Sequence, residues 1–406
     1  MDAEWILAEI GSFKMAGPVQ MVCLDNIGLL LTDLDYFEKR TALLETRRAL
    51  LNAHIHGIFV QEDTAATDLR APSPEEFSTD LLVQLSLRDE RSSFKVREIE
   101  ILKARHQYYY RGAHHFSIAG KGMTRDFYLG ARTARGPGLR IYPSEAAQLS
   151  IARDAARFKV PQRSSAAMDL GHPALNACFA GGEGPGTLSS TVLLAEPGTR
   201  PAYLSLRFLA AARAQDEVTL MVSTREDRDA LRRIMSRDDA LRPHLRERPI
   251  EVDNPEEEGL AAFHPAFRVL YLHPEFISPG KFVWDIVRLA IGGHGRSTGA
   301  ATRVAFDAIF RLEDRFPLIT HESFLIPALI DLLRYNAISP WGVDLIPPGA
   351  ASLQAGGFDP SPYFAAFDNV FLLSPGEDSK TGTLRVLKAM GGDFERGPRK
   401  ITYGAG

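Results

Sequence analysis

The chain has 406 residues, which is enough for two domains of ordinary size. Its residues are 45% hydrophobic and 24% charged, the balance of a globular protein with a sizeable core, and this excludes a disordered or fibrous chain. The formal net charge is −4 and basic residues are scattered among acidic ones, so nothing in the charge points to a nucleic-acid partner.

The cysteine content and the apolar segments bear on where the protein is found. Cys23 and Cys178 are the only cysteines, and each lies in an apolar segment, so we expect both to be buried and no disulfide framework to form. No segment reaches about 18 consecutive apolar residues, so we expect no membrane span. The first residues lack the positive charge that opens a secretory signal, and the cytoplasm is the expected location.

The first part of the chain, residues 1–120, begins with a short strand and a helix. A buried strand is predicted at 19–24, ending at Asp25, and the apolar spacing at 38–54 predicts a helix. A second strand at 94–102 runs into the segment Leu102-Lys-Ala-Arg105. The residues that follow are rich in glycine, and we expect 121–168 to be a linker.

The second part, residues 169–406, has the pattern of a complete α/β domain. Strands are predicted at 192–195, at 303–306 and at 384–387, and helices after the Pro197-Gly198-Thr199 turn and at 323–336. Because strands alternate with helices, we expect a mostly parallel sheet flanked by helices. Loops are expected at 255–259 and 347–357. The predicted core residues are Trp284, Ile286, Val304, Phe306, Ile309, Leu312, Phe316, Leu329, Leu332 and Leu333.

The two parts resemble each other at a nearly constant offset, which is the mark of an internal duplication. Four segments recur in the same order after 279 to 285 residues. The pairs are Trp5–Ile10 with Trp284–Leu289, Met21–Leu30 with Arg303–Leu312, Ile101–Arg105 with Val386–Met390, and Arg111-Gly112 with Arg396-Gly397. The sequence therefore predicts one partial copy, 1–120, and one complete copy, 169–406, of the same domain.

Residues 195–202 of the complete copy have the frame of a phosphate-binding loop without its chemistry. In the motif G-x-x-x-x-G-K-[ST], placed between a strand and a helix, the lysine reaches the phosphates and the hydroxyl binds Mg²⁺. Here Ala195 and Arg200 stand at the glycine positions, and Pro201 and Ala202 replace the lysine and the hydroxyl residue. We therefore expect this copy not to bind Mg·ATP, although an arginine such as Arg200 can hold a phosphate in a bidentate manner.

The corresponding loop of the partial copy would lie before Met1. We expect either that the chain is a truncated product or that an upstream or separate polypeptide completes the first copy. Strands that are normally central would otherwise lie at an open sheet edge, so self-association is the other expected way to cover them.

With these features in hand, the chain resembles the KaiC-type branch of the RecA-like P-loop ATPases over about residues 1–120 and 170–403. The resemblance rests on Gly181-Gly182, Pro197-Gly198-Thr199, Val222–Asp227, Asp307 and Arg315–Leu318. It implies two tandem RecA-like P-loop NTPase domains, a ring of six subunits, and ATP with Mg²⁺ between neighbouring subunits. It also implies that Pro197, Gly198, Thr199 and Arg200 contact the nucleotide.

The same resemblance assigns roles to further residues. It places Asp25 and Asp307 at the Walker B position, where an acid at a strand end holds the metal through water, although a structural or capping role is equally open. It places Glu226 where such ATPases polarise the attacking water. Arg225 stands where a second glutamate is usual, and its charge should weaken Glu226 as a base. A plain helix start, with Asp227 and Asp229 in or before the first turn, is the alternative.

Lys103 and Arg105 match the Lys-x-Arg pair that the family projects toward a neighbour's γ-phosphate, where it would neutralise charge in the transition state. The alternative is an exposed face of an edge strand. The second copy keeps Lys388 but has Met390 at the arginine position. The arginines Arg228, Arg232, Arg233 and Arg237 alternate with aspartates, and we expect them to form an ion-paired exposed helix face. No metal site is expected outside the resemblance.

These expectations favour a non-hydrolysing regulatory or scaffolding protein built on an ATPase fold. An enzyme whose first ATP site is completed by an upstream half is the first alternative. A RecA-like DNA-handling protein is the second, and the charge argues against it.

Overall fold

A computed structural model describes most of the chain, and all structural statements below concern the residues it describes. These are Ala8 and residues 19–62, 74–88, 95–119, 138–156, 167–213, 217–245, 250–251, 260–264, 266–272, 278–291, 300–309, 325–349, 358–390 and 393–404. They form two units. The first comprises residues 1–84 and 101–110, and the second comprises 85–100 and 111–406.

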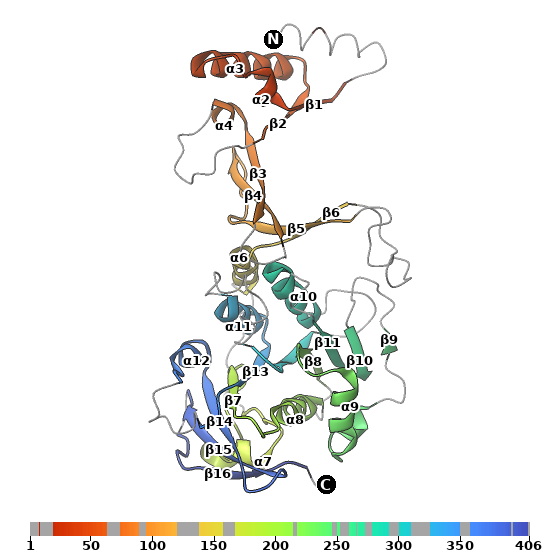
Figure 1. Cartoon of the computed structure of the whole chain (residues 1–406), viewed down its shortest axis with the longest axis vertical. Coiled ribbons are helices and arrows are strands. Elements are labelled where there is room, and N and C mark those ends of the chain that lie inside the picture. Colours follow the sequence, from red (N-terminus) through yellow and green to blue (C-terminus); the bar gives the residue numbers. More distant parts are fainter. Residues whose placement is uncertain are drawn as a thin grey trace. The chain divides into compact units, whose positions relative to one another are not determined.

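The second unit is built around a sheet in which ten strands are described (Figure 1). Six neighbouring strands, β14, β7, β13, β12, β8 and β11, are parallel, and antiparallel strands extend the sheet at both edges. In sheet order the bounds are β16 Arg399–Thr402, β15 Thr381–Lys388, β14 Asn369–Pro375, β7 Thr191–Ala195, β13 Ser339–Leu345, β12 Ala301–Phe306, β8 Val218–Ser223, β11 Phe267–Tyr271, β10 Leu260–His264 and β9 Ile250–Glu251. The predicted α/β class with a mostly parallel sheet is confirmed.

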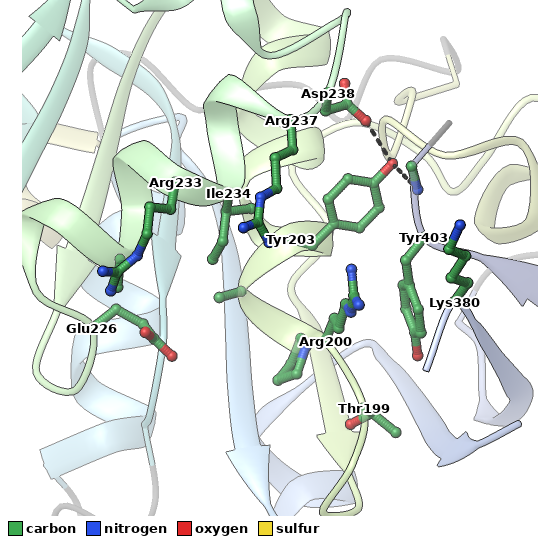
Figure 2. A pocket seen from close by; sticks show the side chains of 14 residues that line it. Thr199, Arg200, Tyr203, Glu226, Arg233, Ile234, Arg237, Asp238, Lys380 and Tyr403 are labelled. Atoms are coloured by element: carbon green, nitrogen blue, oxygen red, sulfur yellow. Dashed lines mark hydrogen bonds between the residues drawn. The ribbon is translucent and has the colours of Figure 1, made fainter. Parts of the chain in front are cut away.

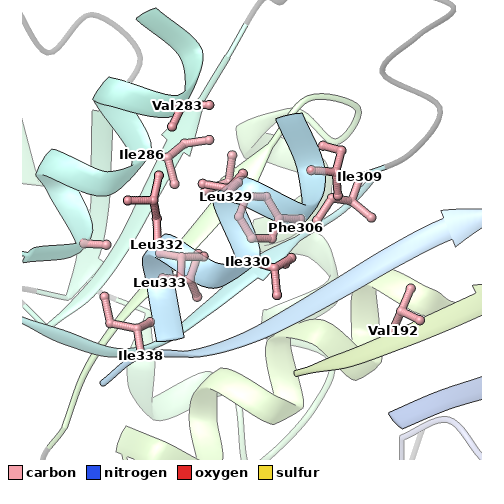
Figure 3. Packing of buried hydrophobic residues seen from close by; sticks show 14 of the residues in the cluster. Val192, Val283, Ile286, Phe306, Ile309, Leu329, Ile330, Leu332, Leu333 and Ile338 are labelled. Atoms are coloured by element: carbon pink, nitrogen blue, oxygen red, sulfur yellow. The ribbon is translucent and has the colours of Figure 1, made fainter. Parts of the chain in front are cut away.

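Helices cover both faces of this sheet because both faces of its central strands are apolar. In β7, Val192 and Leu194 belong to one buried cluster and Leu193 to the other, as the alternation of side chains along a strand requires. The first cluster lies under α10 Pro279–Ile291, α11 Leu325–Tyr335 and α12 Ser361–Ala366, and Figure 3 shows part of it. The second lies under α8 Pro201–Arg213 and α9 Arg228–Ser236. Short helical turns are α7 Pro173–Asn176, η2 Ala180–Gly182 and η3 Arg242–His244.

Most of the predicted core is confirmed. Seven of the ten named residues are buried: Ile286, Val304, Phe306, Ile309, Leu329, Leu332 and Leu333. Trp284 was wrongly placed in the core, because it is only half-buried. It lies on the flank of α10, whose core-facing side is formed by residues at helical spacing such as Phe282, Ile286 and Leu289. Leu312 and Phe316 lie outside the described residues.

The expected linker at 121–168 contains regular structure. Strand β6 Gly138–Tyr142 pairs with β5 His114–Ala119, and α6 Glu145–Ala156 packs against α11. The linker was predicted from the glycines in the early part of this segment, and the short strand and the helix that follow them were therefore missed. Strands β5 and β6 belong to a second sheet of order β3-β4-β5-β6.

The first unit holds a two-stranded parallel sheet of β1 Met21–Asp25 and β2 His56–Val60. The unit also contains helices α2 Ile27–Leu30, α3 Tyr36–Asn52 and α4 Pro74–Ser78. Strands β3 Leu81–Arg88 and β4 Val96–Ala104 belong partly to the first unit and partly to the second. The predicted helix at 38–54 and the strands at 19–24 and 94–102 are therefore present, with bounds shifted by one or two residues. That the units are copies of one domain stays a prediction.

The strand at the start of the first unit is more exposed than predicted. Met21 is 58% exposed on β1 and Ile58 is 45% exposed on the paired β2. Cys23 on β1 is also exposed, so its expected burial was wrong, whereas Cys178 is buried as expected. A two-stranded sheet offers no third layer to cover its outer face.

Replacing Phe306 by alanine should destabilise the second unit by roughly 3–5 kcal/mol, because the ring is 1% exposed in the centre of the sheet and its removal leaves a cavity. Thermal or denaturant unfolding measures the change. The matched control is Phe37→Ala on α3, where the ring is 74% exposed, so the free energy of unfolding should change by only about 0.5 kcal/mol. Equal stability of Phe306→Ala and the parent chain would refute the core assignment.

Candidate functional site

The connection between β7 and α8 is a tight turn that closes on itself. Thr199 donates both its backbone N–H, at 3.3 Å, and its Oγ1 hydroxyl, at 2.6 Å, to the carbonyl oxygen of Glu196. Pro197 follows Glu196, and Gly198 has a φ of 90°, the pattern of a type II turn. Glycine suits this third turn position because residues with a side chain rarely adopt a positive φ. The Thr199 hydroxyl and amide are therefore engaged within the loop.

The next three residues begin α8 without the groups that would hold a nucleotide phosphate. Arg200 is exposed, and Pro201 at the helix start has no amide N–H. Ala202 is buried with only a methyl group, and Ala195 at the end of β7 is fully buried. The four residues implied to contact the nucleotide thus lie on one loop, but Arg200 alone presents a charged group.

Asp307 follows the end of β12 and is 4% exposed. Its carboxylate accepts five hydrogen bonds from the last residue of β8 and the loop that follows. The donors are the Ser223 and Thr224 hydroxyls and the Thr224, Arg225 and Glu226 backbone N–H groups, at 2.5 to 3.1 Å. A carboxylate has about four lone-pair sites, so these donors fill it. The structure gives Asp307 the capping role that the sequence left open.

Glu226 lies at the end of the loop that Asp307 holds. Its side chain is half-buried, and no described residue donates a hydrogen bond to its carboxylate. Burial, helped by the nearby Asp307 carboxylate, raises the pKa of Glu226, and Arg225 offsets only part of this effect. The expected effect of Arg225 is confirmed in direction, since it lowers the pKa of Glu226, but burial and Asp307 outweigh it. The predicted helix start is confirmed, since Asp227 caps α9 by accepting from the Ala230 N–H at 2.6 Å.

A cavity of about 630 Å³ opens beside this loop (Figure 2). Three segments line it: the start of α8, one face of α9 with the flanking residues Glu226 and Asp238, and the C-terminal part of the chain with Lys380, Tyr403 and Gly404. Tyr203 donates to Asp238 at 2.8 Å and accepts from the Gly404 N–H at 3.2 Å, which fastens these segments together. Asp238 also pairs with Arg207 at 3.2 Å, so its charge is compensated.

Four basic side chains line this cavity: Arg200, Arg233, Arg237 and Lys380. Each is exposed, and none has a carboxylate within ion-pair distance among the described residues. The expectation of an ion-paired α9 face was therefore wrong for Arg233 and Arg237. Residues at 230, 233, 234 and 237 share one face of the helix, and that face borders the cavity, whereas the acids Asp229 and Asp239 do not line it.

Lys103 and Arg105 are engaged inside the first unit. Lys103 donates to the Glu76 carbonyl at 2.6 Å, and Arg105 donates to the Phe77 carbonyl at 3.0 Å, so both stabilise the C-terminal end of α4. Burial lowers the pKa of Lys103, and the adjacent Arg105 adds to this. Arg105 also lies 3.4 Å from Asp80, which pairs with Arg47 at 2.9 Å. Strand β4 pairs with β5 at Glu98 and Ile99 and ends at Ala104, so the alternative of an edge-strand face at Lys103 stays a prediction.

Lys388 makes the matching contacts in the second unit. Its ammonium donates to the carbonyls of Phe364 and Phe367, each at 2.6 Å, at the end of α12. Sequence reasoning missed this shared structural role. The available signal was Pro72-Ser-Pro-(x)5-Asp80, which recurs as Pro360-Ser-Pro-(x)5-Asp368 and marks the same helix-to-strand junction.

Asp25 lies exposed at the end of β1, and its carboxylate has no hydrogen-bond or ion-pair partner among the described residues. It belongs to the first unit, as do Lys103 and Arg105, whereas Glu226, Asp307 and the loop at 195–202 belong to the second. The two strand-end aspartates therefore have different surroundings. Within the second unit, the structure brings together the loop at 195–202, Glu226 and Asp307.

No family model matches the chain, and no curated protein matches it. Within the described ranges, no three His, Cys, Asp or Glu side chains are grouped so that they could hold a metal ion. None of the described helices has the length and apolar character needed to cross a membrane.

Replacing Glu226 by glutamine should raise the melting temperature at neutral pH. Because the folded-state pKa is raised, ionisation of the carboxyl destabilises the folded state once the pH exceeds the unfolded pKa of about 4.3, and this cost is absent below that value. Thermal unfolding between about pH 4 and pH 7 should therefore show a gain that fades toward the acid end. The exposed Glu377→Gln is the control and should show little change at either pH. A gain independent of pH would contradict the assignment.

Proposed function

We propose that this chain is a non-hydrolysing regulatory or scaffolding protein with a RecA-like ATPase fold. The observation that carries the proposal is the closed turn at Glu196–Thr199, where the loop expected to hold phosphate uses its own hydroxyl and amide internally. The sheet supports the fold assignment. Strand β7 lies between parallel neighbours β14 and β13, its loop opens α8, and the strand-end acid Asp307 follows β12.

The residues present do not fit Mg·ATP. A hydroxyl to ligate Mg²⁺ is missing at Ala202, the Thr199 hydroxyl donates to Glu196, and the Asp307 carboxylate is filled by five donors from its own chain. Glu226 could act as a base, but among the described residues of this site no hydroxyl or second carboxylate is free to ligate the metal of Mg·ATP. We therefore derive no hydrolytic step at this site.

The scaffolding part of the proposal rests on the first unit. Apolar side chains are exposed on both strands of its small sheet, and exposed apolar surface of this kind is covered in many proteins by a partner. The chain should associate with copies of itself or with another polypeptide of the same fold. The formal net charge of −4 gives no support to a DNA-handling role.

The full chain should release no phosphate from Mg·ATP above the buffer rate, because its loop cannot bind the metal complex. Phosphate release measured beside Glu226→Gln decides the point. Turnover that requires Mg²⁺ and disappears in Glu226→Gln would mean that the site hydrolyses ATP. Light scattering on the same sample tests the association: we expect a mass above that of one chain at micromolar concentration, and a well-behaved monomer would remove the scaffolding part.

A further inference from the structure

The cavity beside the closed turn has the size of a small-molecule site. Its volume of about 630 Å³ lies within the range of roughly 300–1,000 Å³ that ligand pockets occupy. Its walls come from three segments that Tyr203 joins through Asp238 and the Gly404 N–H. The cavity is therefore part of the folded domain and does not depend on a single loop.

The charges around this cavity favour an anion. Arg200 and Lys380 come from the start of α8 and the C-terminal part, and Arg233 and Arg237 come from α9, so the cations lie on separate walls (Figure 2). None has a carboxylate partner among the described residues, and Arg207 compensates Asp238. Glu226 is the remaining acid of the lining. Four unpaired cations against one unpaired acid leave a net positive site.

The same geometry favours a phosphorylated anion without a bound metal. Three of the cations are arginines, whose planar forks match phosphate oxygens in bidentate pairs. The groups that would be needed to ligate Mg²⁺ are absent or engaged, as described for Ala202, Thr199 and Asp307. A divalent cation on the ligand would neutralise the charge that the arginines recognise and would gain no protein ligand in return.

We propose that this cavity binds a small molecule bearing two or more phosphate groups, in its metal-free form, through Arg200, Arg233, Arg237 and Lys380. The inference deepens the proposed function, since it concerns the same site and supplies a ligand for regulation without hydrolysis. Cations on separate walls require a ligand with more than one anionic group, and the α8 turn with its exposed Arg200 takes part without acting as a phosphate loop.

Calorimetric titration of the full chain with inorganic tripolyphosphate tests the proposal. In the presence of EDTA we expect saturable binding at one site, and excess Mg²⁺ should weaken it. Arg233→Gln and Arg237→Gln should each weaken binding about tenfold, the loss expected for one charged hydrogen-bonding group. Arg232→Gln is the matched control, because it makes the same change on the same helix at a residue outside the cavity lining.

Each outcome decides for or against the inference. No binding in EDTA, stronger binding with Mg²⁺, or equal losses in Arg232→Gln and Arg233→Gln would overturn it. A single-stranded oligonucleotide that binds more tightly than tripolyphosphate through the same arginines would show a nucleic-acid surface and would also overturn it. Circular dichroism of each variant verifies folding. Failure here leaves the proposed lack of hydrolysis intact, because that claim is measured by phosphate release.

Discussion

The carboxylate of Asp307 organises the edge of the sheet where the candidate site lies. It joins the end of β12 to the whole loop after β8, and three consecutive backbone amides point at it. An unpaired buried carboxylate would be costly, and unpaired buried amides would be too, so each side satisfies the other. This mutual arrangement fixes where α9 begins and therefore where Glu226, Arg233 and Arg237 are placed.

The same arrangement supports the proposal that this fold does not hydrolyse ATP. A strand-end acid that ligates a metal must keep lone pairs free, whereas the lone pairs of Asp307 are occupied by its five hydrogen-bond donors. A phosphate loop must keep amides free, and the turn after β7 uses its Thr199 amide and hydroxyl for the Glu196 carbonyl. What remains unpaired beside these groups is the set of cations on α8, α9 and the C-terminal part. The site is thus better suited to hold an anion than to activate one.

Much of the fold could be predicted from local pattern. Apolar runs and helical spacing located β7, β12, α3 and α11, because each of these elements buries a continuous face. The half-burial of Trp284, the exposure of β1 and the strand β6 within a glycine-rich segment depend on which elements pack together, which no local window contains. At the site, the phosphate-loop frame predicted the loop at 195–202, and the position of Asp307 at a strand end predicted that it belongs to the same site. The unpaired state of Arg233 and Arg237 was missed because interspersed acids suggested ion pairs that the helix geometry does not make.

The most direct test of the central claim is backbone amide hydrogen exchange at Thr199, Thr224, Arg225 and Glu226 in the full chain. If these amides are engaged within the protein, they should be protected, and millimolar Mg·ATP should leave their exchange unchanged. In Asp307→Asn, where one acceptor oxygen is lost, the amides from Thr224 to Glu226 should exchange faster while Thr199 stays as it was. Rapid exchange in the parent chain, or protection that changes when Mg·ATP is added, would show that the groups are free to bind nucleotide and that the account is wrong.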